Sequence, residues 1–190
     1  GEVYAQMAQA FFPDIEERTL AGIRKLKSVQ PVITFSENIV LNLGSRRIEI
    51  MHVGGHTPAT AVIYLPESGV LFTGDVHVHN RHPYTGDGNL LHWIEALKRI
   101  ERLGVSQVVP GHGEVCDLKS VSRLRRFFEE MKGQVVELIE QGFGRGEVEE
   151  RVDLLTFFPV EPGKEPRIKS FIRIGAGRMF NQLFESALER

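Results

Sequence analysis

The middle of the chain alternates short apolar runs with turn residues, a pattern typical of a β-sheet. Glu37-Asn38, Gly44-Ser45 and the segment 66–69 supply the turns. The runs predict strands over residues 31–35, 39–43, 47–53, 61–65 and 70–73, and a further short strand over residues 107–109.

On both sides of this block the apolar residues recur at helical spacing. Residues 89–103 carry one apolar stripe, and Gly104 is well placed to end that helix. Further helices are predicted over residues 14–28, 118–141, 147–156 and 168–190, with a proline-containing loop over residues 158–166. The mixture of strands and helices indicates a fold of the α/β (α+β) class.

Three motifs bracketed by small residues follow the predicted strands: Gly54-Gly55-His56-Thr57-Pro58-Ala59, Gly74-Asp75 and Pro110-Gly111-His112-Gly113. If the chain reverses direction at each hairpin and crosses over through the helix at 89–103, all three motifs end at the same edge of the sheet. That edge is where α/β folds usually bind their ligands. His56, Asp75 and His112 are therefore expected to converge there, and they are side chains that zinc takes from proteins.

Composition and charge place only a few limits on the domain number, the partners and the location of the protein. With 190 residues, 42% apolar content and a net charge of −2, the chain predicts one domain, or one domain with a helical extension. The charge balance gives no reason to expect binding to nucleic acid or to an anionic membrane. The single cysteine, Cys116, excludes an internal disulfide and fits a reducing compartment, so a cytoplasmic location is expected.

In their order and spacing, GGHTPA, FTGD and PGHG resemble the later metal-binding motifs of the metallo-β-lactamase superfamily. The resemblance covers residues 38–116 and implies a four-layer αββα sandwich and a zinc-dependent hydrolase. Under it, His56 is a ligand of the first metal, Asp75 bridges both metals and His112 is a ligand of the second. Asp75 and His112 are the expected catalytic residues, and Thr57 is expected to assist through its hydroxyl.

The family's His-x-His-x-Asp-His element has no counterpart before His52, a span that contains no histidine. The resemblance therefore implies a partial metallo-β-lactamase-like domain over residues 1–116, lacking its N-terminal sheet, with a C-terminal helical region at 117–190 packed on it. One zinc ion or none is expected in this chain alone, against one or two in the family. Because the strands at 61–65 and 70–73 are apolar on both faces, a further layer should cover the sheet.

A second group of histidines, His77, His79 and His82, is expected in a polar loop that lines the mouth of the site. Its spacing is that of the missing element, but Arg81 stands where the Asp would be and cannot bind a metal. His52 is expected to be packed or hydrogen-bonded on its strand. Cys116 is expected to be a small packed residue and not a ligand.

The leading hypothesis is a hydrolase in which metal-activated water attacks a small ester, thioester, lactone or lactam. One alternative is a non-catalytic half-domain that self-associates or binds a partner through its exposed sheet. Another is a fragment that becomes active only with a second chain carrying the missing histidines. The expected partners are a small-molecule substrate and either a second copy of the chain or a complementary N-terminal segment; neither nucleic acid nor a membrane is expected.

Overall fold

The structure is a computed structural model that describes residues 1–188, apart from the side chain of Phe11. It divides into two compact units, Gly1–Thr34 and Phe35–Arg190. The boundary at Cys116 that the resemblance implies remains a prediction. Among the described helices, none combines the length and the apolar character needed to span a membrane.

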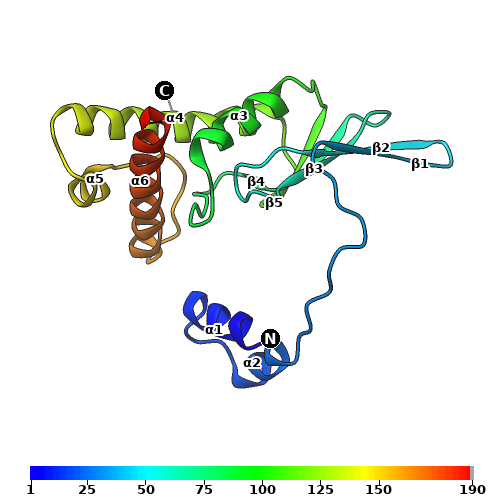
Figure 1. Cartoon of the computed structure of the whole chain (residues 1–190), viewed down its shortest axis with the longest axis horizontal. Helices are drawn as coiled ribbons and strands as arrows, with labels where there is room; N and C mark the ends of the chain where they lie inside the picture. The colour runs from blue at the N-terminus through cyan, green and yellow to red at the C-terminus, as the bar shows by residue number, and fades with distance from the viewer. Residues whose placement is uncertain (189–190) are drawn as a thin grey trace. The chain divides into compact units, whose positions relative to one another are not determined.

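The first unit is a pair of helices, α1 (Glu2–Phe11) and α2 (Glu17–Arg24), which pack together and bury Ala5 and Leu20 (Figure 1). The sequence did not predict α1, and α2 is shorter than the predicted helix at 14–28. The strand predicted at 31–35 is wrong, because that segment is irregular. Pro31 has no amide hydrogen for a β-ladder, and Val32 is 99% exposed, without a neighbouring strand.

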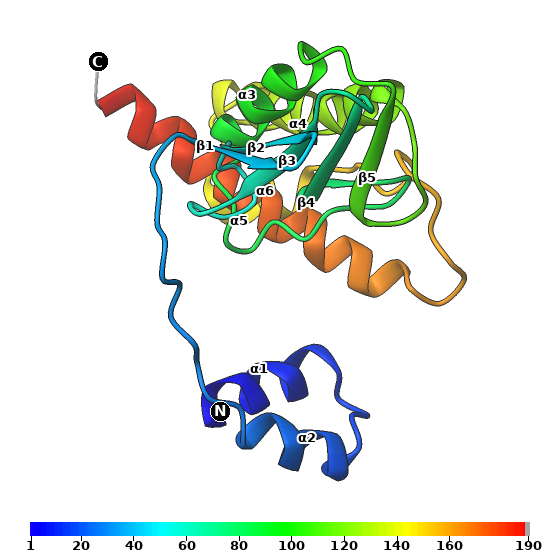
Figure 2. The ribbon, with the colours of Figure 1, turned by 90° about the vertical axis from the view of Figure 1, so that its right-hand side faces the viewer.

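The second unit is built on one five-stranded sheet, whose strands lie side by side in chain order (Figure 2). The strands are β1 (Asn38–Leu43), β2 (Arg46–His52), β3 (Ala61–Leu65), β4 (Val70–Val78) and β5 (Gln107–His112). Neighbouring strands from β1 to β4 are antiparallel, whereas β5 runs parallel to β4. These directions confirm the topology predicted from the hairpins and the crossover helix.

Two helices, α3 (Leu90–Glu101) and α4 (Leu118–Glu140), pack on one face of this sheet. Two more, α5 (Arg145–Arg151) and α6 (Glu165–Leu188), pack on those helices. α3 and α4 contact β4 and each other, and α6 packs against both. The core between the layers joins Val62 and Leu71 of the sheet to Trp93 of α3 and Phe128 of α4, all fully buried.

The other face of the sheet carries a continuous row of apolar side chains. Strand register places these residues directly opposite one another in neighbouring strands: Ile39, Ile50, Ile63, Phe72 and Val109. Ile63 is 40% exposed and Phe72 is 41% exposed. The expectation that both faces are covered is therefore not met within the described part of this unit.

Candidate metal centre

The loop between β2 and β3 holds His56 in place. Hydrogen bonds close this loop, from the amides of Val53 and Gly54 to the carbonyl of Thr60 and from the His52 ring to the carbonyl of Pro58, 2.7 Å away. Gly55 has a φ of +89°, and a Cβ there would lie 2.9 Å from the Cα of Trp93. Glycine is needed at this position because both the backbone angle and the close approach exclude a side chain. The expectation that His52 is hydrogen-bonded on its strand is confirmed.

Asp75 lies inside β4, not just beyond its end as the sequence suggested. The ladder between β4 and β5 is irregular around Gly74, which has a φ of +53°. The sequence could not show that β4 continues through this glycine, because the continuation depends on pairing with β5, more than thirty residues away. Gly111 in β5 lies so close to Asp75 that a Cβ there would overlap the carboxylate.

The structure brings the three predicted metal ligands together. One carboxylate oxygen of Asp75, Oδ2, lies 3.8 Å from Nε2 of His56. The other oxygen, Oδ1, lies 3.5 Å from Nε2 of His112. Each oxygen of the carboxylate thus faces a different imidazole. The hydroxyl of Thr57 forms its hydrogen bond with the hydroxyl of Thr60, 3.0 Å away, and not with one of the three predicted ligands.

His56 is positioned by an aromatic neighbour. Its ring meets the ring of Trp93 edge to face, with centroids 5.1 Å apart. The indole nitrogen of Trp93 donates a hydrogen bond of 2.8 Å to the carbonyl of Val76, the residue after Asp75. Trp93 therefore links the orientation of His56 to the strand segment that carries Asp75.

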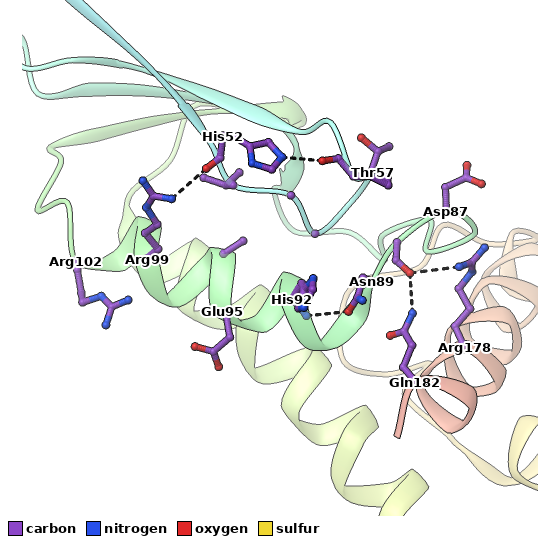
Figure 3. A pocket seen from close by; sticks show the side chains of 16 residues that line it. His52, Thr57, Asp87, Asn89, His92, Glu95, Arg99, Arg102, Arg178 and Gln182 are labelled. Atoms are coloured by element: carbon purple, nitrogen blue, oxygen red, sulfur yellow. Dashed lines mark hydrogen bonds between the residues drawn. The ribbon is translucent and has the colours of Figure 1, made fainter. Parts of the chain in front are cut away.

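A pocket of 670 Å³ lies beside the loop that carries His56 (Figure 3). The loop, the outer side of α3 and one turn of α6 line it, and the described lining residues do not include His56, Asp75 or His112. Arg99 of α3, Arg102 at its end and Arg178 of α6 are among the lining residues. The guanidinium of Arg99 also donates a hydrogen bond of 3.0 Å to the carbonyl of His52. The volume of the pocket lies within the range of known small-molecule binding sites.

The second histidine group is placed differently from the prediction. His77 is not in a loop but in β4, where it is fully buried, and His82 is also buried and bonds the carbonyl of Leu154 at 2.9 Å. His79 follows β4 in a turn and is half-buried. Ligand atoms of His77, His79 and Cys116 all lie within 4.8 Å of one another. Only the His-x-His spacing hinted at this group, since Cys116 is distant in sequence.

Burial of His82 makes the stability of the fold depend on pH. Desolvation lowers the pKa of His82, with a smaller opposing effect from its bond to the Leu154 carbonyl. The folded chain then keeps the ring neutral where the unfolded chain, with a His pKa of about 6.5, binds a proton. Stability is therefore expected to fall as the pH drops below about 6.5.

Urea unfolding at about pH 7 and about pH 5 measures this loss. The His82→Gln variant stays uncharged at both values and should lose less stability between them than the native chain. An equal loss in the two proteins would show that His82 does not contribute.

Sequence comparison connects this site to a known family. A family profile described as the metallo-beta-lactamase superfamily matches residues 6–112, more than half of the chain. The chain belongs to the metallo-beta-lactamase superfamily.

Curated relatives within the superfamily cover only part of the chain. The acyl-coenzyme A thioesterases MBLAC2 of Bos taurus and Homo sapiens are each 26% identical over 113 residues, which is 53% of this chain and 38% of each relative. Among solved structures, a metallo-beta-lactamase family protein of Thermus thermophilus matches with a TM-score of 0.61 and 19% identity. That match covers 99% of this chain and 60% of the other, and it supports the fold.

Metallo-beta-lactamase superfamily members are usually metal-dependent, and the residues around Asp75 suit a divalent ion. Two nitrogen or oxygen ligands of one tetrahedral zinc lie about 3.4 Å apart. The separations of 3.5 and 3.8 Å between Asp75 and the two imidazoles are near that value and longer than normal hydrogen bonds. Each Asp75–imidazole pair is therefore spaced to share a metal, although the ligand atoms of His56, Asp75 and His112 do not all lie within 4.8 Å of one another.

Proposed function

We propose that this chain forms the metal-binding part of a hydrolase whose substrate is a small-molecule ester or thioester. The observation that supports this most strongly is the Asp75 carboxylate, which presents one oxygen to His56 and the other to His112. Because the chain covers 38% of its curated relatives, the activity of the whole protein is part of the proposal.

Each residue has a role that follows from its position. His56 and His112 offer imidazole nitrogens, and a carboxylate oxygen of Asp75 faces each of them. A divalent ion held by these groups would polarise a substrate carbonyl and activate water for attack. Trp93 keeps the His56 ring in one orientation, and Gly111 leaves the space that the Asp75 carboxylate occupies.

A thioester with an anionic carrier is the favoured substrate class. The relatives that are 26% identical are acyl-coenzyme A thioesterases. The pocket beside the His56 loop has room for part of such a molecule, and Arg99, Arg102 and Arg178 bring positive charge to it. Arginine is well suited to bind phosphate groups.

Hydrolysis of an acyl-coenzyme A by the zinc-loaded chain, followed through the released thiol, tests this proposal. His112→Ala should lower kcat/KM by about 100-fold or more, a loss at least as large as that for residues that only support metal ligands. Gln107→Ala, at the exposed start of the same strand as His112 and outside the lining of the pocket, is the control and should stay near the native value. Unchanged turnover in His112→Ala would remove His112 from the mechanism.

The exposed apolar row on the sheet favours a second candidate function, a half-domain that self-associates. Ile63 and Phe72 at the middle of the row are too exposed for a buried sheet, and contiguous apolar patches commonly mark interfaces. This candidate predicts a dimer by light scattering that Phe72→Lys converts to a monomer. A native chain that is monomeric at all concentrations would contradict it.

A further inference from the structure

A second group of side chains with metal-ligand chemistry lies near the first and shares no residue with it. His77 is at the end of β4, His79 is in the turn that follows, and Cys116 lies between β5 and α4. Their ligand atoms are all within 4.8 Å of one another. The cluster contains no carboxylate, so it differs in chemistry from the group around Asp75.

The backbone holds this cluster in place. Cys116 exchanges two hydrogen bonds with Val108, of 2.8 and 2.9 Å, which fixes it beside β5. The amide of His79 donates a hydrogen bond of 2.9 Å to the carbonyl of His112. A Cβ at Gly113 would lie 2.9 Å from Cβ of His79, so this glycine permits the close approach. Backbone contacts therefore hold the end of β4, β5 and the segment after β5 together around this cluster.

The distances within the cluster match those between ligands of one metal ion. Nε2 of His77 lies 3.5 Å from Sγ of Cys116. A tetrahedral zinc with a nitrogen ligand at about 2.0–2.1 Å and a sulfur ligand at about 2.3 Å sets these two atoms about 3.6 Å apart.

The hydroxyl of Ser120, in the first turn of α4, marks the point on which the three side chains converge. Its Oγ lies 3.1 Å from Nε2 of His77 and 2.7 Å from Nδ1 of His79. One small group thus contacts both imidazoles, and Nε2 of His77 in turn lies beside Sγ of Cys116.

We propose that His77, His79 and Cys116 bind a thiophilic transition-metal ion such as Zn²⁺. A thiolate with two imidazoles selects zinc, cobalt or copper over magnesium and calcium, which prefer oxygen ligands. On binding, the thiol of Cys116 releases its proton to solvent and the sulfur bonds to the metal. The fourth position of a tetrahedral ion would be open to water.

Such an ion would stabilise the backbone that carries Asp75 and His112. His77 is two residues after Asp75, and Cys116 is four residues after His112. An ion that joins them would fix the last residues of β4 relative to the segment that follows β5, close to Asp75 and His112. This role is structural and does not depend on hydrolysis.

Cobalt titration of the full chain tests the proposal, because a thiolate bound to Co²⁺ gives a charge-transfer absorption in the near ultraviolet that histidine and carboxylate ligands do not give. The native chain should show this band, and Cys116→Ser should lose it. In His79→Ala, the Co²⁺ dissociation constant measured from the growth of this band should rise by about tenfold or more. Far-ultraviolet circular dichroism confirms that each variant is folded.

Two matched controls separate this site from its neighbours. Ser120→Ala removes the hydroxyl but no ligand and should keep the band, and His112→Ala should also keep it even though it disables the first centre. A folded native chain without the band would overturn the proposal. An unchanged Co²⁺ dissociation constant in His79→Ala would also overturn it.

Discussion

Asp75→Asn is expected to reduce kcat/KM for thioester hydrolysis by about 100-fold or more, with little change in stability. The amide has nearly the shape of the carboxylate but no negative charge. It also presents one oxygen where Asp75 presents two, so it can face His56 or His112 as a ligand but not both. Steady-state assay of the zinc-loaded variant measures the effect.

Asp14→Asn is the matched control for this prediction. It makes the same chemical change at an exposed turn residue of the first unit that does not line the pocket beside the His56 loop. Its turnover should stay within about twofold of the native value, consistent with a surface substitution. Equal losses at Asp75 and Asp14 would indicate that general charge, and not a metal ligand, controls the rate.

Gly111→Ala is expected to disrupt the same centre by steric means alone. A Cβ at Gly111 would overlap Oδ1 of Asp75 and would lie 2.6 Å from the carbonyl carbon of Gly74. It would also lie 2.8 Å from the amide nitrogen of Asp75. Backbone atoms cannot rotate away, so the strands must separate. We expect a loss of about 1–3 kcal/mol in the free energy of unfolding, and a weaker affinity for zinc.

Gly133→Ala provides the contrasting substitution. Gly133 lies inside α4 with nothing within 4 Å of a Cβ, so alanine should stabilise the helix by about 0.5–1 kcal/mol. Chemical denaturation of the two variants measures both changes. A Gly111→Ala chain as stable as the native one, with unchanged zinc affinity, would show that the close packing of β5 on Asp75 is not important.

The strands that set the candidate site could be predicted because their signals are local. Alternating apolar residues and turn glycines gave β2, β3 and the start of β4, and the hairpin rule then placed His56, Asp75 and His112 at one edge. The convergence of these three side chains in the structure follows from that topology.

What the sequence could not show depends on distant partners. The apolar segment at 31–35 has strand composition but no neighbour with which to form a ladder. β4 extends to Val78 only because β5 pairs with it beyond Gly74. The approach of Cys116 to His77 likewise joins residues 39 apart, a contact that spacing alone cannot indicate.

Zinc binding to the Cys116→Ser chain, measured by equilibrium dialysis, tests the central claim most directly, since that background removes the thiolate site. With His56, Asp75 and His112 intact, about one zinc ion per chain is predicted. Adding Asp75→Ala should remove that ion, with the fold preserved by circular dichroism. Equal zinc binding with and without Asp75, or none in the Cys116→Ser chain, would contradict the account.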